Sequence, residues 1–290
     1  MVVAISFATA NNVFLKKFNN KTIDNIGDAF FFNGSLNVVW IVIMAIWFFI
    51  DNGNFISVEA IIFGLVYGLI LCAFFYFKMQ SLAEGPVSFT TLISSAAFVP
   101  ATIFGIFYAS ESASWMQILG MVVMLISLYM CVNPKKSAEK LTTKWFVYCI
   151  LFFTAGSLLG MFYKVFGKSG ASSEVNGMML SASIFASVFF FLMGVILNKS
   201  RKLPMPKIKK PSLIYILLSG ITGCFYIRIN LALSSVIPSA IFFPVSNGSL
   251  VILSTVIGCI LFKEKLNKIQ WLGILVGIVA IVLSGVGNLI

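Results

Sequence analysis

The stretch ILFKEKLNKIQWLG, residues 260–273, places a short group of charged residues between two long apolar runs. A related stretch, GIFYASESASWMQILG, occupies residues 105–120 and also lies between apolar runs. Four of the matched positions, each separated by 153 residues, are Gly105 and Gly258, Glu111 and Glu264, Gln117 and Gln270, and Gly120 and Gly273. Because the order, spacing and hydropathy of the two stretches agree, we predict that the chain contains an internal repeat. An acidic residue suits a helix N-terminus, so we expect Glu111 and Glu264 to serve the helix that follows each of them.

A second match supports the repeat. The sequence FLKKF at 14–18 resembles FYKVF at 162–166, and Lys16 lies 148 positions before Lys164. We therefore predict two five-helix repeats, residues 1–133 and 145–290, joined by a connecting loop at 134–144. Internal repeats of this kind are typical of membrane transporters.

The composition predicts the fold class. The chain has 290 residues, of which 60% are hydrophobic and only 10% are charged, whereas roughly a quarter of the residues of a soluble protein are charged. A membrane-spanning helix needs about 20 apolar residues. On that criterion we expect ten spans, at about 2–17, 29–50, 58–82, 86–108, 115–132, 145–166, 176–197, 212–234, 238–262 and 269–289. The sequence thus predicts an all-α polytopic membrane protein with about ten transmembrane helices. An odd number of helices in each half makes the two repeats inverted.

Several function classes are disfavoured by the residues that the chain contains. It has no histidine, which removes the commonest metal ligand and general base. Its five cysteines all fall within apolar segments, and no Gly-rich phosphate loop is present. We therefore expect no enzyme activity, no cofactor and no metal. The net charge of +11 comes from short lysine clusters at the ends of apolar runs. Such clusters are typical of membrane proteins, so we expect contact with membrane lipid and none with nucleic acid.

The last predicted helix and the connector before it, FKEKLNKIQWLGILVGIVAIVLSG at 262–285, resemble the drug/metabolite transporter superfamily, in its ten-helix EamA-type branch. The counterpart ASESASWMQILGMVVMLISLYM at 109–130 is a looser match. The resemblance covers nearly the whole chain, in architecture more than in identities. It implies an inverted repeat, a central cavity and transport of small metabolites. The first predicted helix departs from the family, because FATANNVF stands where the family has a tryptophan-bearing pattern.

The distribution of positive charge predicts an orientation. The connectors after the first, fifth, seventh and ninth spans hold 16 of the 20 basic residues. Because cytoplasmic loops carry an excess of lysine and arginine, these connectors are expected in the cytoplasm and both termini outside. The resemblance implies instead that both termini are cytoplasmic. In either orientation we expect a multi-pass protein of the inner (plasma) membrane.

Two predicted helices carry features of a substrate site. Span 86–108 contains Pro100, and span 238–262 contains Pro244. Proline frees a backbone carbonyl, and a freed carbonyl at membrane depth must face protein or a water-filled cavity. Small polar residues near the two prolines are candidate substrate ligands, namely Ser94, Ser95, Ser246 and Asn247. The alternative is that their side chains bond to their own helix and that the prolines only bend it.

Charged and amide side chains complete the candidate site. Arg228 lies within a span, with Tyr226 and Asn230 nearby, and Lys78 lies late in another. Ionisable residues at membrane depth usually face the protein interior or water, although long basic side chains also extend to the headgroup region. Either residue facing a cavity would favour an anionic substrate. The remaining candidates are asparagines of the first two spans, which could instead hydrogen-bond neighbouring helices, namely Asn11, Asn33 and Asn37.

These features favour one function over three alternatives. The leading hypothesis is a secondary transporter that moves a small polar metabolite, including an anionic one, by alternating access. The alternatives are an amino-acid or zwitterion exporter, a lipid-headgroup flippase, and a non-transporting membrane scaffold. All acidic residues fall at helix ends or in connectors, which argues against cation export driven by a membrane-embedded carboxylate.

Overall fold

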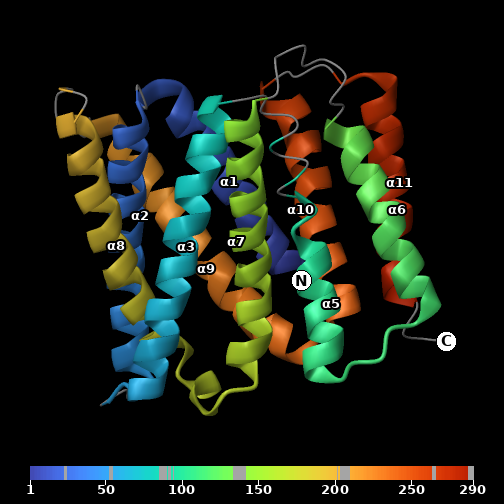
Figure 1. Cartoon of the computed structure of the whole chain (residues 1–290), viewed down its shortest axis with the longest axis horizontal. Coiled ribbons are helices and arrows are strands. Elements are labelled where there is room, and N and C mark those ends of the chain that lie inside the picture. The colour runs from blue at the N-terminus through green and yellow to red at the C-terminus, as the bar shows by residue number, and fades with distance from the viewer. Residues whose placement is uncertain are drawn as a thin grey trace. The chain divides into compact units, whose positions relative to one another are not determined.

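The computed structural model describes residues 1–22, 25–51, 55–84, 90, 93, 95–132, 142–200, 202, 210–262 and 266–286, and these are helical with short connections (Figure 1). The elements are α1 (Val2–Thr22), α2 (Ile26–Ile50), α3 (Val58–Glu84), α5 (Phe98–Ala109), α6 (Trp115–Val132), α7 (Thr143–Gly167), the 3₁₀ turn η2 (Gly170–Ser173), α8 (Val175–Ser200), α9 (Lys210–Val236), α10 (Ser239–Phe262) and α11 (Lys268–Val286). Seven of these helices are long and apolar enough to cross a membrane, and α1, α5 and α6 contain shorter apolar stretches. The prediction of an all-α polytopic membrane protein is confirmed.

Most predicted spans agree with the observed helices to within a few residues. Two differ more. The first helix continues to Thr22 rather than ending near residue 17. Within predicted span 86–108, the continuous helix α5 begins only at Phe98, after a turn at residues 96–97, so that Pro100 lies in its first turn. A proline is tolerated there because the first-turn N–H groups have no helical partner.

The helix boundaries repeat along the chain. Helix α8 begins 149 residues after α2, α9 begins 152 residues after α3, and α11 begins 153 residues after α6. This spacing follows the offset of the sequence match. It equates each of these helices in the first half with one helix in the second.

The matched glutamines of the two repeat stretches perform the same local task. Ser114 N donates to Gln117 Oε1 (3.0 Å) and Gln117 N donates to Ser114 Oγ (3.3 Å). In the second copy, Asn267 N donates to Gln270 Oε1 (3.1 Å) and Gln270 N donates to Asn267 Oδ1 (2.8 Å). Each set is a capping box, which satisfies N–H groups at a helix start. The repeat therefore encodes the starts of α6 and α11.

The chain forms two compact units. Unit 1 comprises residues 73–167 and 232–290 together with Met1, and unit 2 comprises residues 2–72 and 168–231. Each unit thus combines segments from both predicted sequence repeats. Helices α3 and α9 each contribute to both units.

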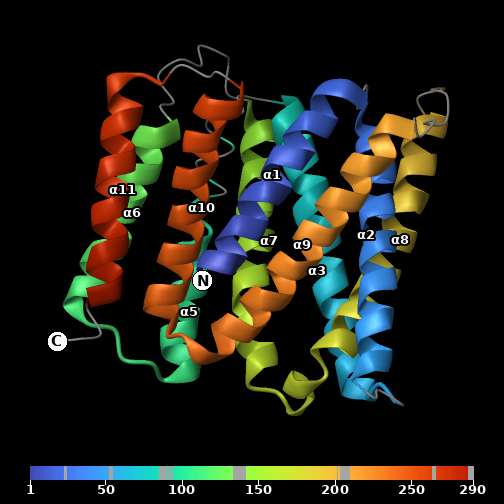
Figure 2. The same ribbon diagram turned by 180° about the vertical axis from the view of Figure 1, so that it is seen from behind.

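In unit 2, α2 and α8 run antiparallel and lie side by side (Figures 1 and 2). Near one end of the pair, Gly27 contacts Asn198. Further along α2, a Cβ on Gly34 would lie 3.0 Å from the ring of Phe191, and Ser187 Oγ donates to Gly34 O (3.2 Å). Small residues allow this close approach of two helices in lipid.

In unit 1, α6 and α11 form a second antiparallel pair. A Cβ on Gly120 would lie 2.9 Å from Ser284 N, and a Cβ on Gly273 would lie 2.9 Å from Cys131 N. The two contacts are related by the repeat offset, because Gly273 lies 153 residues after Gly120 and Ser284 lies 153 residues after Cys131. The two helices therefore pack through equivalent positions, as an inverted repeat requires of such a pair.

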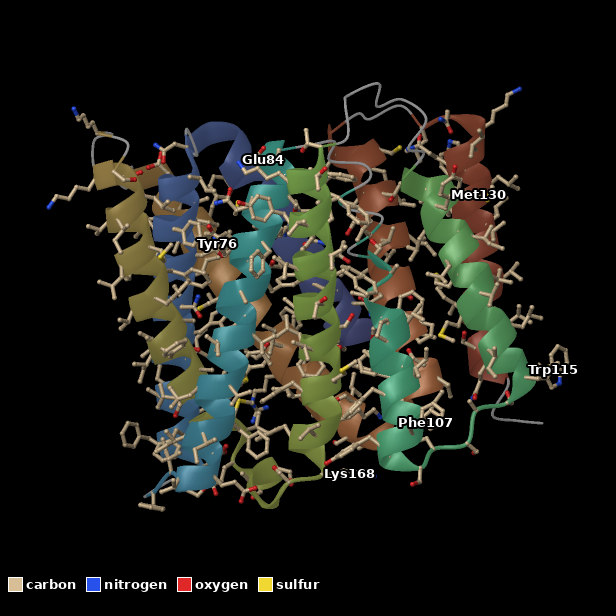
Figure 3. All side chains as sticks on the ribbon, in the orientation of Figure 1. Tyr76, Glu84, Phe107, Trp115, Met130 and Lys168 are labelled. Atoms are coloured by element: carbon tan, nitrogen blue, oxygen red, sulfur yellow. The ribbon has the colours of Figure 1, made fainter. Side chains whose placement is uncertain are left out.

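Apolar side chains cover much of the outer surface of both units. In unit 1, Phe107 at the end of α5 is 81% exposed and Trp115 at the start of α6 is 68% exposed, and both project away from their helices (Figure 3). Exposed apolar residues on this scale fit a lipid environment, and tryptophan is enriched where a membrane meets water.

Candidate functional site

Unit 2 contains a group of buried polar side chains between α1, α2 and α9. Asn11 Nδ2 on α1 donates to Ser219 O on α9 (2.6 Å) and lies 3.4 Å from Thr222 Oγ1. Asn11 therefore makes an interhelical hydrogen bond, which agrees with the alternative given above for the asparagines. A Cβ on Gly223 of α9 would lie 2.9 Å from Asn11 Nδ2 and 3.2 Å from Trp40 Cζ2. The missing side chain lets α9 approach both groups.

The two predicted asparagines of α2 form a chain along the helix. Asn33 Nδ2 donates to Ala29 O and Asn37 Nδ2 donates to Asn33 O, each at 2.8 Å. Asn37 is only 5% exposed. Its Oδ1 is buried and has no hydrogen-bond partner in the part of the chain that the structure describes. The same holds for Trp40 Nε1, one helical turn further along α2.

Asn37 and Trp40 line a small pocket in unit 2. Helix α3 contributes Tyr67 to it and α8 contributes Ser183, and the remaining lining side chains are apolar, namely Leu71, Met179 and Ala182. The space not filled by atoms is about 180 Å³, but in this conformation it is too narrow to admit a water molecule. Among the residues that the structure describes, no charged side chain lines the pocket. Its lining residues therefore combine aromatic rings with neutral hydrogen-bonding groups, whose polar atoms are buried rather than exposed to this space.

Arg228 lies at the end of unit 2 where α2 ends and α8 begins. Its Nε donates to Asn176 Oδ1 (3.0 Å), and its guanidinium carbon lies 4.5 Å from the centre of the Trp47 ring. Asn176 Nδ2 in turn donates to Asp51 Oδ2. A cation over an indole face is attracted to it. Arg228 thus joins α9 to the ends of α2 and α8.

The neighbours predicted for Arg228 have other partners. Asn230 is 3% exposed, and its Nδ2 donates to Tyr226 O on the same helix (2.9 Å). Tyr226 itself is half-buried. These contacts fit a bond back to the helix, so the assignment of Tyr226 and Asn230 as substrate ligands stays a prediction.

The remaining predicted site residues that the structure describes lie in unit 1. Asn247 Nδ2 donates to Phe243 O (2.9 Å) across the interior proline of α10, Pro244. Ser246, Ser95 and Lys78 are half-buried, and Ser94 lies outside the described residues. Pro100 and Pro244 are not equivalent, because the repeat offset places the counterpart of Pro244 at position 91.

A buried ion pair in unit 1 was not predicted. Lys164 Nζ on α7 donates to Glu111 Oε1 (2.8 Å) and to Ile237 O (2.9 Å). Glu111 Oε2 accepts from Ser239 N at the start of α10 (2.6 Å). Glu111 therefore serves the N-terminus of α10, whereas we expected it to serve α6. The sequence signal existed, since Lys164 and Glu111 both belong to matched positions of the repeat.

Other unpredicted residues give little or no sequence signal. Trp40 lies within an apolar run, where tryptophan is unremarkable, and Asn176 lies at a predicted helix end. Their importance arises from contacts between helices far apart in sequence. Among the described residues, no group of three or more histidine, cysteine, aspartate or glutamate side chains could hold a metal ion.

The comparisons with known proteins identify the family. The family described as "Sugar transport protein" matches residues 4–289. The chain belongs to this family. It is therefore a membrane transporter with several transmembrane helices. The narrower EamA-type assignment stays a prediction.

Similarity to individual proteins adds the fold alone. No curated protein matches the sequence. A solved structure titled "Crystal structure of protein" is similar with a TM-score of 0.79 and 9% identity, over 99% of this chain and 94% of that chain. At such low identity the likeness supports the fold of this sugar transport family member and says nothing of its substrate.

Proposed function

We propose that this protein is a secondary transporter that moves a neutral sugar across the inner (plasma) membrane by alternating access. The observation that carries the proposal is the unit 2 pocket, whose polar lining residues Asn37, Trp40, Tyr67 and Ser183 carry no charge. Membership of a family described as sugar transport protein supports the same substrate class.

The chemistry of the pocket suits a polyhydroxylated molecule. Each sugar hydroxyl can both donate and accept a hydrogen bond. It can therefore pair with an amide oxygen, with another hydroxyl or with an indole N–H, which only donates. Ligand sites combine a largely apolar lining with a few placed polar groups. The rings of Trp40 and Tyr67 and the aliphatic side chains provide the apolar part. No cofactor, metal or covalent step is needed for transport of this kind.

A second candidate is an anionic metabolite, and Arg228 is the observation that favours it. Its guanidinium is half-buried, and only its Nε makes a hydrogen bond within the described residues. However, the group is also held by the Trp47 ring, and Asn176 links it to the Asp51 carboxylate. These contacts satisfy part of its charge without a ligand. They make the neutral pocket the better-supported site.

Uptake into proteoliposomes tests the proposal. The purified protein is reconstituted and offered radiolabelled D-glucose, D-galactose, D-ribose and D-xylose, with D-gluconate and ribose 5-phosphate as anionic counterparts. We expect saturable uptake of at least one neutral sugar and none into protein-free liposomes. Uptake confined to the anions would overturn the proposal in favour of the second candidate.

A further inference from the structure

Two buried polar atoms on α2 have no hydrogen-bond partner among the described residues. Asn37 Oδ1 is an acceptor and Trp40 Nε1 is a donor, and neither makes a hydrogen bond within the described residues. Leaving such a group buried costs free energy, and native proteins rarely do so unless a water or a ligand completes the site. The two residues are three apart, so they lie on neighbouring parts of one helix face.

The orientation of Asn37 follows from its other hydrogen bond. Its Nδ2 donates to Asn33 O, and a carbonyl can accept only from the nitrogen of the amide. The Oδ1 atom must therefore face away from that carbonyl. It thus remains available to a ligand donor.

The surroundings of Trp40 hold the indole in place. Gly223 lies against the indole, where a Cβ would be 3.2 Å from Cζ2 and 3.6 Å from Nε1. On the pocket side, Tyr67 and Met179 are almost fully buried. Ser183 Oγ already donates to Met179 O (2.7 Å), which leaves its oxygen able to accept. The pocket therefore combines fixed side chains with unused hydrogen-bonding capacity.

We propose that Asn37 and Trp40 form the hydroxyl-binding subsite of the transporter, in which Asn37 Oδ1 accepts from one sugar hydroxyl and Trp40 Nε1 donates to the same or a neighbouring one. This inference rests on the proposed function. The pocket is closed to water in the present conformation, so the ligand enters when α2, α3 and α8 open during the transport cycle. The subsite binds the hydroxyl edge of a neutral sugar.

Two substitutions test the subsite. Asn37→Leu removes the acceptor, and Trp40→Phe removes the donor while keeping an aromatic ring. Each loses one hydrogen bond to a neutral ligand, so we expect the KM for the sugar taken up in the panel above to rise about 3- to 10-fold. Trp40→Phe removes an unsatisfied buried donor, so the melting temperature of the sugar-free protein should stay the same or rise. Asn37→Leu removes an unsatisfied acceptor together with the hydrogen bond from Asn37 Nδ2 to Asn33 O, so its melting temperature should change little.

Two buried residues of unit 1 provide matched controls. Trp145 is 3% exposed, and its Nε1 donates to Thr90 Oγ1 (3.1 Å). Thr102 is fully buried, and its Oγ1 donates to Phe98 O (2.9 Å). Trp145→Phe and Thr102→Val should leave the KM unchanged. Trp145→Phe should lower the melting temperature, because it breaks a satisfied bond.

Monodeoxy analogues of the transported sugar distinguish direct contact from a structural role. Wild-type protein should bind one analogue about 3- to 10-fold more weakly than the parent sugar, and Trp40→Phe or Asn37→Leu should bind parent and analogue equally. If both variants keep the wild-type KM and the wild-type discrimination, the subsite is wrong while sugar transport stands. If the wild-type protein takes up no neutral sugar, the proposed function itself fails.

Discussion

Lys164 and Glu111 form an ion pair in unit 1, with their charged atoms 2.8 Å apart and the lysine side chain 4% exposed. The pair links α7, the connection between α5 and α6, and the start of α10 through Ile237 O and Ser239 N. Removing one partner of a buried pair leaves an uncompensated charge, whereas replacing both with apolar groups can be nearly neutral. The pair therefore makes a specific prediction for single and double variants.

Lys164→Met should destabilise the protein by about 3–5 kcal/mol, because it strands the Glu111 carboxylate. Glu111→Gln should also destabilise the protein, because it leaves the buried Lys164 ammonium without a counter-charge, although the amide oxygen can still accept from Ser239 N. The double variant should recover part of the loss. Thermal unfolding in detergent, followed by fluorescence, measures all three. A double variant as unstable as the sum of the single ones would show that the two residues act independently.

The Glu111 carboxyl predicts a dependence of stability on pH. Burial alone would raise its pKa, but hydrogen bonds from Lys164 and Ser239 outweigh burial and lower the pKa below the ordinary 4.5. A lowered pKa in the folded state stabilises the protein at pH values above the ordinary pKa. That contribution should be lost as the pH falls below 4.5 and through the lowered value. The difference in melting temperature between wild type and Glu111→Gln, measured from pH 7 to pH 3, should shrink toward acid; a constant difference would contradict the assignment.

The two capping boxes should contribute similarly. Ser114→Ala and Asn267→Ala each remove the side chain that accepts from the backbone N–H of Gln117 or Gln270. Loss of such a cap costs about 0.5–2 kcal/mol, and the two losses should add because the sites are separate. Chemical or thermal unfolding of the two single variants and the double variant checks this. A large cost at one site and none at the other would mean that only one helix start depends on its cap.

The spans were predictable because about 20 apolar residues are needed to cross a membrane and polar residues mark the ends. The end of α1 was missed because the polar residues after position 17 continue the helix. The match between Gln117 and Gln270 in the repeat is explained by the capping boxes, in which both glutamines take part. That alignment also contained the Lys164–Glu111 pair, but a linear offset does not say which residues meet.

The candidate site was less predictable for a physical reason. An asparagine at membrane depth can bond to its own helix, to a neighbour or to a ligand, and sequence does not distinguish these. Asn247 bonds to its own helix and Asn11 bonds to α9, whereas Asn37 keeps an unused acceptor. Trp40 gives no polar signal within an apolar run. Only the packing of α2 against α3 and α8 reveals the pocket.

The orientation of the chain in the membrane is a prediction that can be measured directly. The basic connectors predict that the C-terminus, which follows α11, lies outside the cytoplasm. Half of the 16 basic residues of these connectors fall outside the described residues. A C-terminal alkaline phosphatase fusion should be active and a green fluorescent protein fusion dark. Cytoplasmic fluorescence would instead support the orientation that the family resemblance implies.

Substitution of Arg228 tests whether this residue has a structural role or binds substrate. Arg228→Lys keeps the charge but loses the planar Nε–H that bonds Asn176 and weakens the stacking on Trp47. If Arg228 only joins α9 to α2 and α8, the variant should lower the melting temperature and leave the KM for a neutral sugar within about twofold of wild type. Loss of a ligand contact worth more than about 0.5 kcal/mol would change the KM by more than that. Asn176→Ala should have the same effect, because it removes the shared partner of Arg228 and Asp51. A rise in KM confined to anionic compounds in both variants would assign the cluster to substrate binding and favour the second candidate function.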